Sequence, residues 1–179
     1  MNTIIKEYQE TIYPQLQETF KIENPMQVPA LKKININTGF SEANDNIIKE
    51  VTSNLAAITG QKPALTRAKK AVSNFKIRKG DIVGCQVTLR KGRMYDFLQR
   101  LVHIVIPSIR DFQGIPRNSF DGNGNYNMGL HEIIIFPEIN PDNVEYNHGL
   151  DISIVTTTND DKQAFKLLQL FGMPFEHGE

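Results

Sequence analysis

The chain has 179 residues, 40% of them hydrophobic, and its 20 basic and 20 acidic side chains give a formal charge of zero. These values are ordinary for a globular protein, and the length suits a single domain, taken here as residues 1–179. The one cysteine, Cys85, excludes an internal disulfide and favours a reducing, intracellular compartment. No apolar run approaches the ~18 residues needed to span a bilayer, so no membrane partner is expected.

Four helices are predicted, because apolar side chains recur every three or four residues in four segments. Gly60 and Gly172 are natural stops for the second and fourth helices, and Pro107 ends the third. The predicted helices cover residues 4–20, 45–59, 93–106 and about 160–171.

Strands are predicted between these helices, mostly where apolar and polar side chains alternate. The segment Lys79-Gly80-Asp81 indicates a hairpin turn between two of them. The pattern favours an α+β fold: a largely antiparallel sheet with helices packed on one face and the other face exposed. The predicted strands cover residues 33–37, 74–78, 86–90, 133–136 and 150–154.

Charge is distributed unevenly along the chain. Residues 62–100 contain 11 Lys or Arg and only two acidic residues, and the segment up to residue 117 has a net charge of +10. Residues 1–61 have a net charge of −2 and residues 118–179 a net charge of −8. A basic segment bordered by acidic ends indicates a binding site for a polyanion, and nucleic acid is the leading candidate.

The predicted exposed face of the sheet carries both basic side chains and side chains that form hydrogen bonds. Amides, hydroxyls and cations with almost no carboxylate can donate hydrogen bonds to phosphate and ribose oxygens. These positions carry no aromatic residue, so recognition of a folded RNA backbone is favoured over stacking of single-stranded bases. An ordinary solvated sheet face is the alternative interpretation. The predicted face carries Asn35, Asn37, Lys76, Arg78, Gln86, Thr88 and Arg90.

One segment resembles a calcium-binding loop, with Asp121, Asn123, Asn125 and Glu132 at the first, third, fifth and twelfth positions. Position six is Tyr126, however, where the sharp turn of such a loop needs glycine. A Gly/Asn-rich turn that leads into a strand is the better interpretation.

No metal or cofactor is expected, and no set of nucleophile and base suggests an enzyme. Cys85 falls in a predicted strand segment without a histidine near it in sequence. We therefore expect it to be a small buried side chain and not a nucleophile.

A series of short motifs, in this order along the chain, resembles the ribosomal protein L5 family of the large subunit, bacterial or organellar. The resemblance extends from about Tyr8 to Phe175. The motifs are Gly60–Pro63, Thr66–Lys70, Phe75–Arg78, Val87–Arg90, Arg93–Leu98, Ile109–Phe112, Ser119–Gly122, Gly124–Tyr126, Ile135–Ile139, Asp151–Thr156 and Gly172–Phe175.

The resemblance implies a structural protein of the central protuberance that binds 5S rRNA and helps attach it to the large subunit. It also implies contacts with 23S-type rRNA, with neighbouring large-subunit proteins, with P-site tRNA and, through an inter-subunit bridge, with a small-subunit head protein. By position, the 5S contacts of the family fall on Asn37, Gln61 and Thr88. The tRNA-facing loop corresponds to about 70–79, and the bridge to loops around 109–117 and 138–148.

The charge pattern and the resemblance together give one set of expected RNA-binding residues. A free RNA-binding regulator with this fold, or an enzyme using the 120–132 loop, are the alternatives. Ser108, Gln113 and Asn123 stand where the family usually has arginine, so weaker phosphate contacts are expected from 108–123. The expected RNA-binding residues are Asn35, Asn37, Gln61, Lys62, Thr66, Arg67, Lys69, Lys70, Lys76, Arg78, Gln86, Thr88 and Arg90, and those of the tRNA-facing loop are Lys70, Ser73, Asn74 and Lys79.

Overall fold

The structure is a computed structural model that describes residues 6, 8–40, 44–110 and 112–176. Its contacts divide the chain into two compact units, each assembled from segments that are distant in the sequence. Unit 1 consists of Met1–Ile34, Leu89–Met128 and Ser153–Glu179, and unit 2 of Asn35–Thr88 and Gly129–Ile152.

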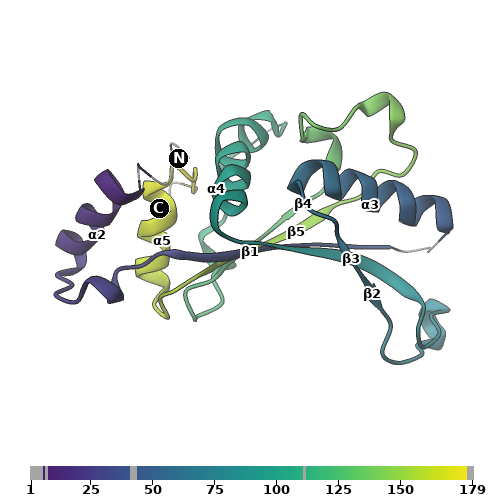
Figure 1. The fold of residues 1–179 in the computed structure, drawn as a ribbon, viewed down its shortest axis with the longest axis horizontal. Helices are drawn as coiled ribbons and strands as arrows, with labels where there is room; N and C mark the ends of the chain where they lie inside the picture. The colour runs from purple at the N-terminus through teal and green to yellow at the C-terminus, as the bar shows by residue number, and fades with distance from the viewer. Residues whose placement is uncertain (1–5, 7, 41–43, 111, 177–179) are drawn as a thin grey trace. The chain divides into compact units, whose positions relative to one another are not determined.

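Five strands form one open antiparallel sheet in the order β2-β3-β1-β5-β4. The sheet and four α-helices of the described residues confirm the predicted α+β class (Figure 1). None of the helices within these residues is long and apolar enough to cross a bilayer. The strands are β1 (Leu31–Gly39), β2 (Ala64–Arg67), β3 (Ile82–Leu89), β4 (Tyr126–Leu130) and β5 (Leu150–Thr156).

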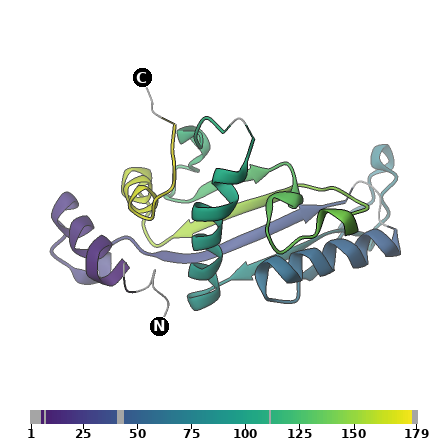
Figure 2. The same cartoon turned by 90° about the horizontal axis from the view of Figure 1, so that it is seen from above.

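Unit 2 is organised by helix α3 (Asp45–Thr59), which lies over one face of the strands of this unit (Figure 2). Val51, Leu55 and Ile58 recur at helical spacing and are fully buried, as the periodicity predicts. The helix ends where predicted, at Gly60, whose φ of 64° is easily adopted by glycine and whose N–H donates to a carbonyl of the last turn. The opposite face of the strands is therefore left open.

Unit 1 contains the other three α-helices. Two of the predicted helices are interrupted: a π-helical turn, Tyr8–Ile12, precedes α2, and another, Leu101–Val105, follows α4. Asp160 caps the last helix, because its carboxylate accepts a hydrogen bond from the N–H of Lys162 at 2.9 Å. Residues 4, 5 and 7 of the first predicted helix lie outside the described residues. The α-helices are α2 (Tyr13–Phe20), α4 (Lys91–Arg100) and α5 (Asp161–Leu170).

Two of the strand predictions are wrong. Residues 74–78 belong to the long connection between β2 and β3, with a 3-10 turn at Ser73–Phe75 in place of a strand. Ile133–Ile135 is also a 3-10 turn, with Ile133 buried, and the strand of this region is β4, which precedes it. Strand β2, which pairs with β3 through Ala64 opposite Gln86, was not predicted.

Candidate nucleic-acid interface

The open face of unit 2 is built by the polar residues that alternate with the core of β1 and β3. Ile36 and Val87 are buried, whereas Asn37, Gln86 and Thr88 on the opposite face are exposed, and Asn35 is half-buried. Alternation along a strand places these four side chains on one face. The prediction of an exposed face of amides and hydroxyls is therefore confirmed for these four positions.

A hydrogen bond across this face fixes two of its side chains. The hydroxyl of Thr88 on β3 donates to Oδ1 of Asn35 on β1 at 3.0 Å. The bond occupies the acceptor oxygen of Asn35, so the amide nitrogen of Asn35 is directed to donate elsewhere. Two of the four side chains of the face are thus held in one orientation.

Gly84 allows β3 to lie close to its neighbouring strands. Gly84 on β3 lies opposite Thr66 of β2 and is buried. A Cβ added at Gly84 would collide with the carbonyl oxygen of Thr38 and would lie 3.2 Å from the hydroxyl oxygen of Thr66. Any side chain here would push apart neighbouring strands, and its absence lets another backbone approach closely.

The turn after α3 brings Gln61 and Lys62 to the start of β2. Thr59 is buried, and its hydroxyl donates to the carbonyl of Leu55 at 2.6 Å. The same hydroxyl oxygen lies 3.1 Å from the carbonyl oxygen of Gln61. These contacts hold the turn, with Gln61 half-buried and Lys62 exposed. Thr66 is half-buried within β2, and Arg67 is exposed at its end.

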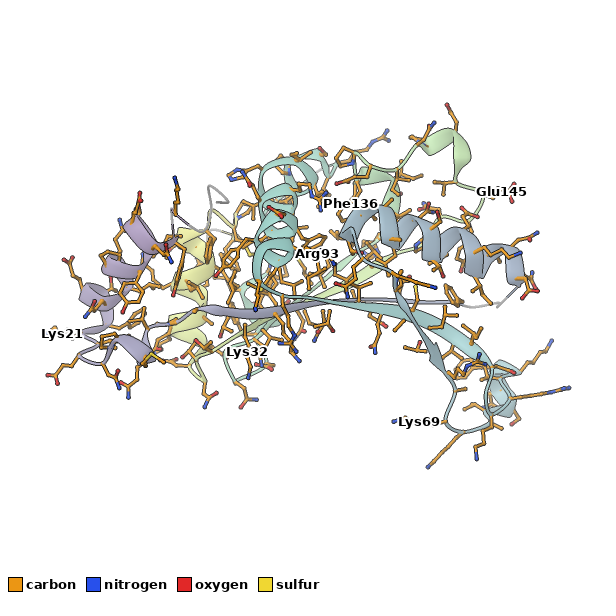
Figure 3. The ribbon with its side chains drawn as sticks, viewed as in Figure 1. Lys21, Lys32, Lys69, Arg93, Phe136 and Glu145 are labelled. Atoms are coloured by element: carbon orange, nitrogen blue, oxygen red, sulfur yellow. The ribbon has the colours of Figure 1, made fainter. Side chains whose placement is uncertain are left out.

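The cations of the basic segment are concentrated in the connection between β2 and β3, here called the β2–β3 loop (residues 68–81). Lys76 and Arg78 lie in this loop, and their predicted place on the sheet face is wrong because residues 74–78 are not a strand. In Figure 3 the labelled Lys69 lies in the hairpin that extends away from α3. Five cations of this loop are exposed: Lys69, Lys70, Lys76, Arg78 and Lys79.

Two internal hydrogen bonds brace the β2–β3 loop at its base. Arg67 Nη1 donates to the carbonyl of Gly80 at 3.0 Å, and the carboxylate of Asp81 accepts the N–H of Arg78 at 2.7 Å. Neither bond involves a lysine. Within the described residues, the amino groups of the loop lysines form no hydrogen bond or ion pair. Their charge is available to an external anion.

Arg90 follows Thr88 by two residues in extended backbone (φ −142°, ψ 159°), so the alternation of β3 continues to this residue. It is exposed and immediately precedes α4, and it belongs to unit 1 by its contacts. The structure brings together Asn35, Asn37, Gln86 and Thr88 on the face, and groups the loop cations separately within the same unit.

Two residues that matter for this surface were missed by sequence reasoning. Asp151 is exposed on β5 between buried Leu150 and Ile152, so it places one carboxylate on the open face. Its alternation with the buried residues could have revealed it. Phe75 was assigned to a buried strand face, yet 73% of its surface is exposed.

The segment that resembles a calcium loop uses its acidic groups internally. The Asp121 carboxylate accepts hydrogen bonds from the side-chain amide of Asn125 at 2.7 Å and from the N–H groups of Asn123 and Asn125. These bonds, the Asn125 amide first, lower the pKa of Asp121 below its usual value. The residue organises a turn, as expected, and no cluster of metal-ligating side chains occurs in the part of the chain that the structure describes.

Cys85 offers no reactive thiol. It is fully buried in β3, and burial raises its pKa to about 11. A thiol with this pKa carries almost no thiolate at neutral pH, and the thiolate is the reactive form. The prediction that Cys85 is a small buried side chain is confirmed.

Comparison with known proteins places the chain in a family. A family model described as "Ribosomal protein L5" matches residues 24–78, and a second model, which describes the C-terminus of the same family, matches residues 82–175. Among curated proteins, the large ribosomal subunit protein uL5 of Thermotoga maritima is 53% identical over 96% of this chain and 95% of its own. The protein of the same name from Halothermothrix orenii is 49% identical, with 98% and 99% covered.

These matches span nearly the whole chain and include both family models. The relatives are bacterial and ribosomal, which assigns the chain to ribosomes of the cytoplasm. Proteins of this family are structural, so the expectation that the chain is not an enzyme is confirmed. The chain belongs to the ribosomal protein L5 family and is a structural protein of the large ribosomal subunit, with ribosomal RNA as its partner.

Proposed function

We propose that the open sheet face of unit 2 binds 5S rRNA and helps attach it to the large subunit in the central protuberance, where 23S-type rRNA is a second partner. The observation that carries this proposal is the pairing of Thr88 with Asn35 on an otherwise open face. Side chains held in one orientation before binding lose little entropy on contact with a ligand.

The chemistry of the face suits the backbone of folded RNA. Amide donors of Asn35, Asn37 and Gln86 can meet phosphate oxygens, and the hydroxyl oxygen of Thr88 can accept from a ribose 2′-OH. Asp151 opposes an anion locally, so the contact is centred on β3 and β1, away from β5.

The β2–β3 loop is proposed to face the tRNA in the P site. Lys70, Ser73, Asn74 and Lys79 are all exposed in this loop, and they combine cations with small hydrogen-bonding side chains. Such residues contact phosphate and sugar groups of any tRNA without reading its sequence. A P-site protein must accept every tRNA, so this chemistry fits.

The contact with a small-subunit head protein is proposed for the loops around 109–117 and 138–148, of which Asp111 lies outside the described residues. The 138–148 loop contains Glu138, Asp142 and Glu145 but no Lys or Arg. It is held to α3, because the carboxylate of Glu50 accepts the N–H of Glu145 at 3.0 Å. A fixed acidic loop fits a basic partner protein, whether in the small-subunit head or among neighbouring large-subunit proteins.

The test is filter binding of purified 5S rRNA to the wild type and to Thr88→Ala and Thr88→Ser. Removing the hydroxyl takes away the Thr88 contact with RNA and leaves Oδ1 of Asn35 without its partner. We expect Thr88→Ala to weaken binding by about 1–3 kcal/mol, the range for leaving a desolvated polar group without its partner. Thr88→Ser retains the hydroxyl and is expected to bind within about threefold of the wild type.

A salt titration separates the two parts of the surface. Thr88→Ala is expected to leave the dependence of log affinity on log salt unchanged, because no cation is removed. Wild-type affinity in Thr88→Ala would remove the sheet face from the proposal.

A further inference from the structure

We propose that the Phe75 ring stacks on an unpaired base of the tRNA that the β2–β3 loop faces, an inference that rests on the proposed function of this loop. Phe75 is 73% exposed, and it is the one exposed aromatic side chain among the described residues. The remaining phenylalanines that the structure describes are buried or half-buried. An exposed aromatic ring needs an explanation that core packing does not supply.

The ring is presented on a closed tip whose backbone is held by hydrogen bonds. Val72 and Ile77 exchange backbone hydrogen bonds at 2.9 and 3.1 Å, which closes the end of the loop. Inside this closure, Ser73–Phe75 forms a 3-10 turn, and Lys76 adopts a positive φ of 54°. The tip is therefore preorganised, and binding a base need not order the backbone first.

The charge around the ring identifies its occupant. Lys70, Lys76 and Lys79 are exposed in the same loop. The one acid of the loop, Asp81, accepts the backbone N–H of Arg78 at 2.7 Å. The exposed apolar side chains of the tip are Phe75 and Val72, which is 41% exposed. Docking into an apolar groove of a protein would need a larger contiguous apolar surface. The combination matches a nucleic acid, because the cations meet phosphates while the ring meets the face of a base.

The sheet face and the tip thus recognise RNA by different means. The sheet face lacks aromatic residues at Asn35, Asn37, Gln86 and Thr88 and meets only backbone atoms. Stacking tolerates every base, because each has a π-face, so it keeps the sequence tolerance that the P site requires. It adds attraction that does not depend on salt, in contrast to the contacts of the lysines.

The test uses ribosomes assembled with variant protein and measures the rate at which tRNA dissociates from the P site. Phe75→Ala is expected to accelerate dissociation on the order of 5- to 150-fold, the range of a single base stack. Phe75→Leu keeps an apolar side chain of similar volume and is expected to show most of this loss, whereas Phe75→Trp is expected to match or exceed the wild type. Because the ring is exposed, none of the three substitutions should affect folding.

A triple variant, Lys69, Lys70 and Lys79→Ala, separates this inference from the proposed function beneath it. If the triple variant releases tRNA faster but Phe75→Ala does not, stacking is wrong and the tRNA-facing loop stands. If neither variant changes the rate, both fail. Wild-type behaviour of Phe75→Leu would also overturn stacking, since an aliphatic side chain would then suffice. Phe75-dependent binding to phosphatidylserine vesicles, with tRNA release unchanged, would assign the tip to a lipid surface instead.

Discussion

Two polar connections of the molecule use their charge in opposite ways. In the loop Asp121–Asn125 of unit 1, the Asp121 carboxylate accepts three hydrogen bonds from its own loop, and Asp161 at the start of α5 accepts the N–H groups of Gly122 and Gly124. In the β2–β3 loop of unit 2, five cations are exposed and the lysine amino groups have no partner among the described residues. Charge satisfied within a loop stabilises the fold, and charge left unsatisfied is available for binding.

The largest effect is expected where charge is satisfied internally. Asp161→Ala removes two charge-assisted hydrogen bonds, to Gly122 at 3.1 Å and to Gly124 at 2.7 Å. We expect the free energy of unfolding, measured by urea denaturation, to fall by about 2–4 kcal/mol. The affinity of the folded protein for 5S rRNA should stay within twofold of the wild type.

Asp161→Asn serves as a graded control, because an amide keeps one acceptor oxygen and should lose about half as much stability. If Asp161→Ala weakened RNA binding without changing stability, the division between the two connections would be wrong.

The opposite behaviour is expected of the β2–β3 loop. The triple variant Lys69, Lys70 and Lys79→Ala removes exposed cations only, so its free energy of unfolding should change by less than about 0.5 kcal/mol. Release of P-site tRNA should accelerate about tenfold or more, with each lost phosphate contact reducing the salt dependence by about 0.7–0.9 log units. A stable variant with an unchanged rate and an unchanged salt dependence would contradict the assignment of this loop.

The smallest effect is expected in the 138–148 loop, from the pH dependence of stability that His148 causes. His148 is 6% exposed. Burial is the main cause that lowers the pKa of His148, and the Tyr146 carbonyl and the Glu50 carboxylate oppose it only in part. Below the ordinary value of about 6.5, the unfolded chain binds a proton that the folded chain does not, so stability falls as the pH falls.

His148→Gln removes this titration. Compared with the wild type, the variant should lose less stability between pH 7 and pH 5, by at most about 1.4 kcal/mol per pH unit. Parallel pH profiles of the two proteins, measured by urea denaturation, would show that His148 titrates alike in the folded and unfolded states.

The sequence was sufficient where local signals and burial agreed. Helix α3 has both a regular apolar face and a glycine stop at Gly60, and the alternation is strict over 33–38 of β1 and 150–154 of β5. These parts could therefore be predicted from periodicity alone. The open face followed from the same alternation, because Asn37 and Thr88 are flanked by residues of the core.

Prediction from the sequence failed where apolar and polar residues alternate but the segment does not pair with a strand of the sheet. Phe75 and Ile77 alternate with polar residues, but the β2–β3 loop extends beyond the sheet and closes on itself through Val72 and Ile77. The apolar run from Ile133 has buried ends, Ile133 and Phe136, and a short apolar run does not distinguish a strand from a 3-10 turn. The sequence also did not show that the basic segment divides into a sheet face and a loop, because this division depends on which strands pair, and no local pattern encodes the pairing.

The central claim is tested most directly by placing a carboxylate in the middle of the open face. Gln86→Glu changes one exposed amide to an acid of the same shape, and Gln15→Glu makes the same change on exposed α2. In filter binding with 5S rRNA, Gln86→Glu should lower affinity about tenfold or more, because a like charge would oppose the phosphates, and Gln15→Glu should have no effect. Equal affinities of the two variants would contradict the assignment of the sheet face to RNA.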